Sequence, residues 1–234
     1  MLSRHHIELS LFSGAILFDW LMVPEIMFFL VLLFGVFVGS LIPDTDLPKS
    51  RMDYMEGVAG FFGLISKVIL NPMVARIFGF LLKRPIDQGH RGITHSVYGI
   101  TAYCLVIAGV GLPIFVAIGW WGIMTALLSL FILGLFVGGI LHLGEDACTR
   151  SGIVPFYPVD STRKYSGSIS TFDFKDNRPN LFSLGLFIVA FLSVLVQVIG
   201  RFQFWAAILL SVVSFVIVWK IILAKSGVTR TTYG

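Results

Sequence analysis

The chain has 234 residues, of which 56% are hydrophobic and 13% charged, with a mean hydropathy of +0.90 and a formal net charge of +4. A soluble domain of this length carries about 25% charged residues, so the composition excludes an ordinary water-soluble enzyme. Its two cysteines, Cys104 and Cys148, give no disulfide pattern.

Six apolar runs follow one another along the chain. A bilayer core of ~30 Å needs about 20 apolar residues per helix, whereas a membrane β-barrel needs shorter, alternating segments. We therefore predict an all-α fold, a polytopic membrane helical bundle of about six transmembrane spans, in a single integral membrane domain over residues 1–234. The predicted spans are residues 7–21, 26–42, 94–118, 123–142, 181–199 and 204–223.

A mixed region, residues 43–93, separates the second and third spans. Its apolar stretches, residues 58–70 and 73–82, are too short to span the bilayer singly, and Pro72 separates them. Basic residues lie within or next to both stretches, as is typical of interfacial helices. We predict a re-entrant hairpin or two interfacial helices in this cytoplasmic insertion.

The third span is expected to begin at Thr94 as its N-cap and to bend near Pro113. Residues 119–122, Gly-Trp-Trp-Gly, indicate an interfacial turn with aromatic anchors. The fourth helix is expected to continue to Cys148, and the polar residues 149–180 are predicted to form a cytoplasmic loop.

The basic residues predict the orientation. With six spans, all of the 17 lysines and arginines except Arg201 fall on one side of the membrane, which the positive-inside rule makes cytoplasmic. We therefore predict a multi-pass protein of the inner (cytoplasmic) cell membrane with both termini in the cytoplasm. An error of one span would instead divide the basic loops between the two sides.

All five histidines fall at cytoplasmic span ends. His90 and His95 flank Arg91 where the third span begins. Arg91 is a planar donor suited to a phosphate or carboxylate. The alternative is a pair of interfacial histidines that only hydrogen-bond to lipid headgroups.

Several carboxylates are expected at the same depth in the membrane as these histidines. Asp44 and Asp46 leave the second span one residue apart and can converge on one cation, although a solvated turn is the alternative. His142 and Asp146 are four residues apart, hence on one helical face, which suits shared metal coordination or a simple histidine–aspartate pair. Glu145 lies beside them in the sequence.

The first span begins at the same level with His5 and His6, of which we favour His6 as the functional residue. Two glycine pairs, Gly35 with Gly39 and Gly134 with Gly138, precede Asp44 and His142. Small residues four apart let membrane helices approach closely, which predicts contact between spans two and four.

Ionisable groups at membrane depth are costly and usually functional. Oxygen and imidazole ligands suit Zn²⁺, Mn²⁺, Mg²⁺ or Fe²⁺. These ligand types do not choose among the four ions, and we take Zn²⁺ as the first choice.

Three segments together resemble the YdjM-type family of membrane-bound metal-dependent hydrolases: residues 41–50, residues 90–96, and the His142-x-x-x-Asp146 segment. The resemblance covers roughly residues 5–160, with His6 in agreement. It implies an integral membrane hydrolase with a divalent metal. The metal-binding positions that carry over are Asp44, Asp46, His90, His95, His142 and Asp146. The chain departs at Leu47, where some relatives carry histidine.

A looser similarity to zinc-dependent phospholipase C, which also uses a His-x-x-x-Asp helix, points towards phosphoesters. We expect a metal-dependent hydrolase that cleaves a lipid or lipid-linked phosphoester, with no nucleic-acid partner. Arg91 would hold the phosphate, and Asp46, Glu145 or a histidine not bound to the metal would serve as general base. The alternatives are a divalent-metal or proton-coupled transporter, for which Asp19 could mark a path, and a non-catalytic membrane organiser. The oligomeric state stays open.

Overall fold

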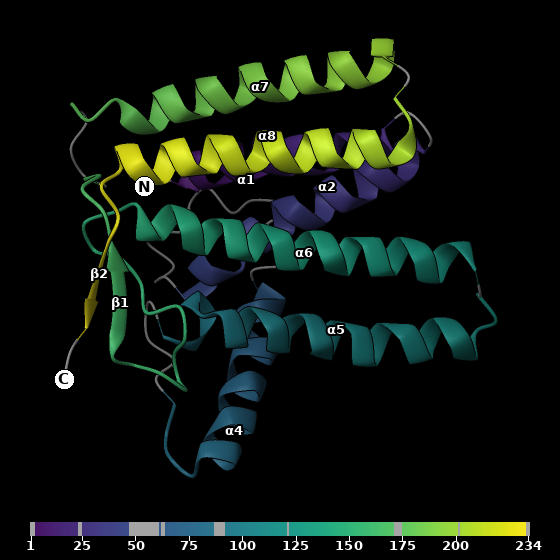
Figure 1. The fold of residues 1–234 in the computed structure, drawn as a ribbon. Coiled ribbons are helices and arrows are strands. Elements are labelled where there is room, and N and C mark those ends of the chain that lie inside the picture. The colour runs from purple at the N-terminus through teal and green to yellow at the C-terminus, as the bar shows by residue number, and fades with distance from the viewer. Residues whose placement is uncertain are drawn as a thin grey trace.

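The computed structural model describes residues 3–22, 25–46, 61, 64–86, 92–120, 122–170, 175–200 and 202–232, without the side chains of Ser3, Thr45 and Asp46. The fold is a bundle of helices with one small sheet (Figure 1), so the predicted all-α class is confirmed. Six helices form the bundle: α1 (Ser3–Phe18), α2 (Ile26–Leu41), α5 (Val97–Ala117), α6 (Ile123–Ala147), α7 (Arg178–Gly200) and α8 (Phe204–Lys225).

Each apolar run of the sequence forms one of these helices. Four of them, α5 to α8, are long and apolar enough to cross a membrane. Helices α1 and α2 have 16 residues each and are therefore about 24 Å long, short of a ~30 Å hydrocarbon core. The predicted count of six spans therefore stays a prediction.

Helix α4 (Asn71–Leu82) continues directly from a π-helical segment, η4 (Ser66–Leu70), and projects sideways from the bundle (Figure 1). The predicted break at Pro72 is wrong, because Pro72 lies in the first turn of α4, where a missing backbone N–H costs little. Asn71 anchors the start of this helix by accepting a hydrogen bond from the Tyr103 hydroxyl of α5.

Helices α2 and α6 pack at the closest distance that their backbones allow. A Cβ atom at Gly39 would lie 2.1 Å from the Leu135 carbonyl oxygen, and one at Gly138 would lie 2.1 Å from the Val36 carbonyl oxygen. The predicted contact between spans two and four is therefore confirmed. Its consequence is that the ends of α2 and α6 lie side by side.

The start of α5 differs from the prediction. Residues Ile93–His95 form a 3₁₀ turn, η5, and the N-cap is Ser96, whose Oγ accepts a hydrogen bond from the Gly99 amide at 2.9 Å. Thr94 is therefore not the cap, and His95 precedes the helix instead of lying in its first turn. The predicted turn between α5 and α6 is present, with positive φ at Gly119 and Gly122.

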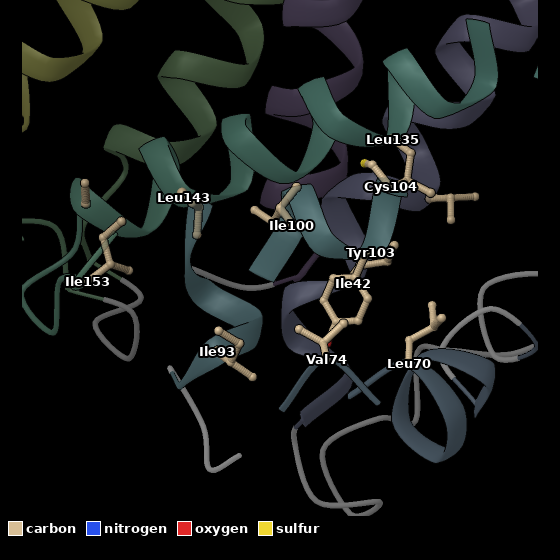
Figure 2. Close-up of a cluster of buried hydrophobic side chains, with 12 residues drawn as sticks. Ile42, Leu70, Val74, Ile93, Ile100, Tyr103, Cys104, Leu135, Leu143 and Ile153 are labelled. Carbon is tan, nitrogen blue, oxygen red and sulfur yellow. The ribbon is translucent and has the colours of Figure 1, made fainter. Parts of the chain in front are cut away.

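The polar residues 149–180 are not only a loop. Strand β1 (Arg163–Ser166) pairs antiparallel with β2 (Thr229–Thr232) at the end of the chain. This sheet lies at the end of the bundle where both chain termini are found (Figure 1), which we call the terminal end. A buried apolar cluster joins α5 and α6 to α4 (Figure 2).

Candidate metal centre

Four buried side chains converge at the terminal end from three separate elements. Asp44 comes from the 3₁₀ turn η2 (Pro43–Asp46), His95 from η5, and His142 and Asp146 from the last turns of α6. His95 and His142 are 0% exposed, whereas Asp146 is 3% and Asp44 8% exposed. His6 of α1, 3% exposed, lies beside them, and we call these five residues the ion site.

The distances within the ion site match a metal coordination shell. His95 Nε2 lies 3.5 Å from Asp146 Oδ2 and 3.7 Å from Asp44 Oδ1. His142 Nε2 lies 3.7 Å from each of these two oxygens. Ligands held at ~2.0–2.2 Å around one tetrahedral ion are about 3.3–3.6 Å apart. Two groups of three residues, His6 with His142 and Asp146, and Asp44 with His95 and His142, could each hold a metal ion, and they share His142.

The tautomer of His142 is determined by its backbone partner. Its Nδ1 donates a hydrogen bond to the Ser40 carbonyl oxygen at 2.7 Å, so Nε2 carries the lone pair. Among the described residues no hydrogen-bond partner faces His142 Nε2, although this nitrogen is buried. A buried acceptor without a partner is costly, and a metal ion would satisfy it.

His6 is oriented by a carboxylate. Its Nδ1 shares a hydrogen bond of 2.5 Å with Glu145 Oε2, and Ser10 donates to the other oxygen of Glu145 at 2.9 Å. The His6 ring stacks on His142 with centroids 4.2 Å apart, and its Nε2 lies 4.0 Å from Asp146 Oδ1. The second ring nitrogen of His6 thus faces one oxygen of Asp146, while the other oxygen of Asp146 faces His95 and His142.

Asp44 is ionised in this environment. Burial by itself raises the pKa of its carboxyl, but the electrostatic influence of the surrounding imidazoles, above all His142 and His95, outweighs burial and holds that pKa well below its usual range. An ionised carboxylate is the form that binds a cation. Asp44 therefore supplies negative charge to a site that otherwise consists of three buried imidazoles and one further carboxylate.

The structure brings together five of the predicted site residues: His6, Asp44, His95, His142 and Asp146. His90, Arg91 and the side chain of Asp46 lie outside the described residues. Glu145 contacts His6 rather than the space between the four ligand atoms. His5 lies apart, with Nε2 3.0 Å from Asn180 Oδ1.

Two partners of the site were not foreseen. Ser10 lies four residues after His6, and this spacing could have marked it as a neighbour on one helical face. Ser40 contributes its backbone carbonyl, which no side-chain pattern reveals.

Asp19 forms a second buried polar cluster at the opposite end of α1. It accepts hydrogen bonds from Ser193 of α7 and Ser211 of α8, and Gln197 Nε2 lies 3.4 Å from its Oδ1. Its oxygens are thus occupied by donors of the chain itself, and the cluster ties α1 to the two C-terminal helices.

Comparison with known proteins finds one family. A family model described as YdjM inner membrane protein matches residues 1–225. No curated protein and no solved structure matches the chain.

Proposed function

Because this chain belongs to the YdjM inner membrane protein family and is a membrane protein, we propose that it is a metal-dependent hydrolase of a lipid or lipid-linked phosphoester. One observation carries the proposal: the buried Nε2 atoms of His95 and His142 each lie 3.5–3.7 Å from one oxygen of Asp44 and one oxygen of Asp146, and these four residues come from three elements. Such a set fits a divalent cation, with Zn²⁺ as the first choice and Mn²⁺, Mg²⁺ or Fe²⁺ as alternatives.

Asp44, His95, His142 and Asp146 would hold the ion, and His6 would add a further nitrogen from α1. A bound divalent ion supplies a Lewis acid and lowers the pKa of a water molecule. Glu145 holds the His6 ring in position, and the Ser40 carbonyl does the same for His142. Arg91 as phosphate ligand, and Asp46 as general base, remain predictions from the sequence.

The ion site would face the cytoplasm. It lies at the terminal end of the bundle (Figure 1), and basic residues of the same end, such as Arg150 and Arg163, fall on the side that the positive-inside rule assigns to the cytoplasm. A lipid phosphoester of the inner leaflet would then present its phosphate at the depth of the ion.

The arrangement supports transport less well. A cation path needs ionisable groups in series through the membrane. The sequence of α1 has no ionisable residue between Glu8 and Asp19, and these positions are about 16 Å apart along a helix. Asp19 is moreover occupied by Ser193 and Ser211.

The test uses purified full-length protein in lipid nanodiscs. We expect it to retain a divalent metal and to release phosphate from a lipid phosphomonoester such as phosphatidic acid. The double variant His142→Ala, Asp146→Ala should lose the metal and all turnover, because loss of a residue that only hydrogen-bonds to a ligand already costs ~10–100-fold in metal affinity or activity. His5→Ala is the matched control, since His5 is a buried histidine of the same end that contacts Asn180.

Two outcomes would count against the proposal. A wild-type protein that retains no metal would remove the ion site. Metal that is retained without turnover of any lipid phosphoester would keep the ion site and discard the hydrolase.

A further inference from the structure

An apolar pocket of about 250 Å³ lies beside the ion site. Its walls are the start of α5, the last turns of α6 and the segment from Ile153 to Tyr165. The Val97 amide donates to the Pro155 carbonyl oxygen at 2.8 Å and so ties this segment to α5. Leu143 and Ile153, which both line the pocket, lie at one end of the buried cluster (Figure 2).

The lining is hydrophobic except for a single hydroxyl. It consists of aliphatic side chains, glycine, proline, Phe156 and Tyr165. Among the described residues, no charged side chain lines it. A pocket of this kind takes an apolar ligand, because each methylene group that leaves water for the pocket contributes to binding, while the side chains of the walls offer a polar group only one hydroxyl.

The pocket and the ion site share one stretch of helix. Leu143 follows His142 and Ala147 follows Asp146, so one helical face of α6 carries ion ligands and the neighbouring face carries the pocket wall. Val97 likewise lies two residues after His95. A molecule with its phosphate at the ion site would therefore have an apolar space on the neighbouring face of the same helix.

We infer that this pocket binds one hydrocarbon chain of the lipid substrate while its phosphate lies at the ion site. The inference rests on the proposed function, and it specifies a substrate with an acyl or prenyl chain next to the phosphoester. A lipid chain is the occupant because α5 and α6 both qualify as membrane spans, so the surroundings of the pocket supply hydrocarbon rather than apolar peptide.

The experiment changes the size of the pocket. Ile140→Phe fills it from α6, and Phe156→Ala enlarges it from the loop. Leu133→Phe is the control for the first change, because Leu133 is on the same helix but 44% exposed on its outer face. Phe191→Ala on α7, where Phe191 is 59% exposed, is the control for the second.

Two readouts separate chain binding from turnover. The first is photolabelling in nanodiscs by phosphatidic acid with a diazirine at its chain end, mapped by mass spectrometry. The second is phosphate release from long-chain and short-chain phosphatidic acid. We expect label on residues 153–165 in the wild type. Ile140→Phe should reduce that label, and should reduce kcat/KM for the long-chain substrate at least about tenfold while sparing the short-chain one.

Phe156→Ala should retain turnover and shift preference towards bulkier chains, and both controls should behave as wild type. Unchanged chain preference in both pocket variants, with an active wild type, would overturn the chain pocket and leave the hydrolase standing. The wild type could instead carry label in the pocket, lose that label in Ile140→Phe, and release no phosphate. This outcome would support chain binding and overturn the proposed function.

Discussion

Two histidines of the ion site are oriented in physically different ways. His142 depends on a backbone carbonyl, that of Ser40, which any residue at that position would supply. His6 depends on a side chain, Glu145, which Ser10 in turn holds. Outer partners of this kind determine which ring nitrogen faces the metal. Substitution should therefore affect the two histidines unequally.

We predict that Glu145→Gln weakens metal binding about 10–100-fold, because the amide cannot accept from His6 and Ser10 at both of its terminal atoms. Ser40→Ala should leave the affinity unchanged, since the carbonyl remains. Competition with a chromogenic chelator on purified protein measures both. Equal affinity in wild type and Glu145→Gln would show that the His6–Glu145 pair does not act on the ion site.

At the scale of elements, the contact between α2 and α6 positions the ligands. Asp44 follows the end of α2, while His142 and Asp146 lie in the last turns of α6. The glycines that face each other across this contact leave no space for a Cβ atom. Because the two backbones are in direct contact, a side chain added within the contact would force the helices apart and displace the ends of both.

Gly39→Ala should destabilise the protein by about 1–3 kcal/mol, since its Cβ would lie 2.1 Å from the Leu135 carbonyl oxygen and force the helices apart. It should weaken metal binding as well, although Gly39 is not a ligand. The control is Gly109→Ala in α5, where no atom lies within 4 Å of the new Cβ and alanine favours the helix.

Unfolding in a denaturing detergent titration measures the loss of stability, and competition with a chelator measures the loss of metal affinity. A Gly39→Ala protein as stable as Gly109→Ala would contradict the close packing of α2 on α6.

At the scale of the whole molecule, both chain ends, the sheet and the ion site lie at one end of the bundle (Figure 1). Strand β2 near the C-terminus pairs with β1, so the end of α8 is tied to the loop that follows α6. We therefore expect the two chain ends to lie on the same side of a membrane that the bundle crosses.

Single cysteines introduced at Leu2 and at Thr232 should both react only with a reagent that enters the cytoplasm. The native cysteines do not interfere: Cys104 is buried, and burial raises the pKa of the Cys148 thiol to about 11, which keeps it protonated and unreactive at neutral pH. Labelling of intact cells with permeant and impermeant maleimides decides the orientation. Reaction of the two positions on opposite sides would overturn the bundle topology and the cytoplasmic ion site together.

The sequence by itself determined the helices and most of the candidate site. In lipid, a long apolar run can pair all of its backbone N–H and C=O groups only as a helix. The order of the helices and their approximate ends therefore followed directly from the sequence. The spacing of His142 and Asp146 placed both on one face because helix geometry is local. The glycine pairs also indicated which helices meet.

Only the tertiary structure decided how distant residues complete the site. The cap at Ser96, the helical path through Pro72 and the pairing of residues 163–166 with 229–232 depend on neighbours that no local pattern specifies. The Ser40 carbonyl and Glu145 act on His142 and His6 across more than 100 residues of chain, at 2.7 and 2.5 Å. Such contacts arise from the packing of whole helices, because a hydrogen bond requires a position in space and not a separation in sequence.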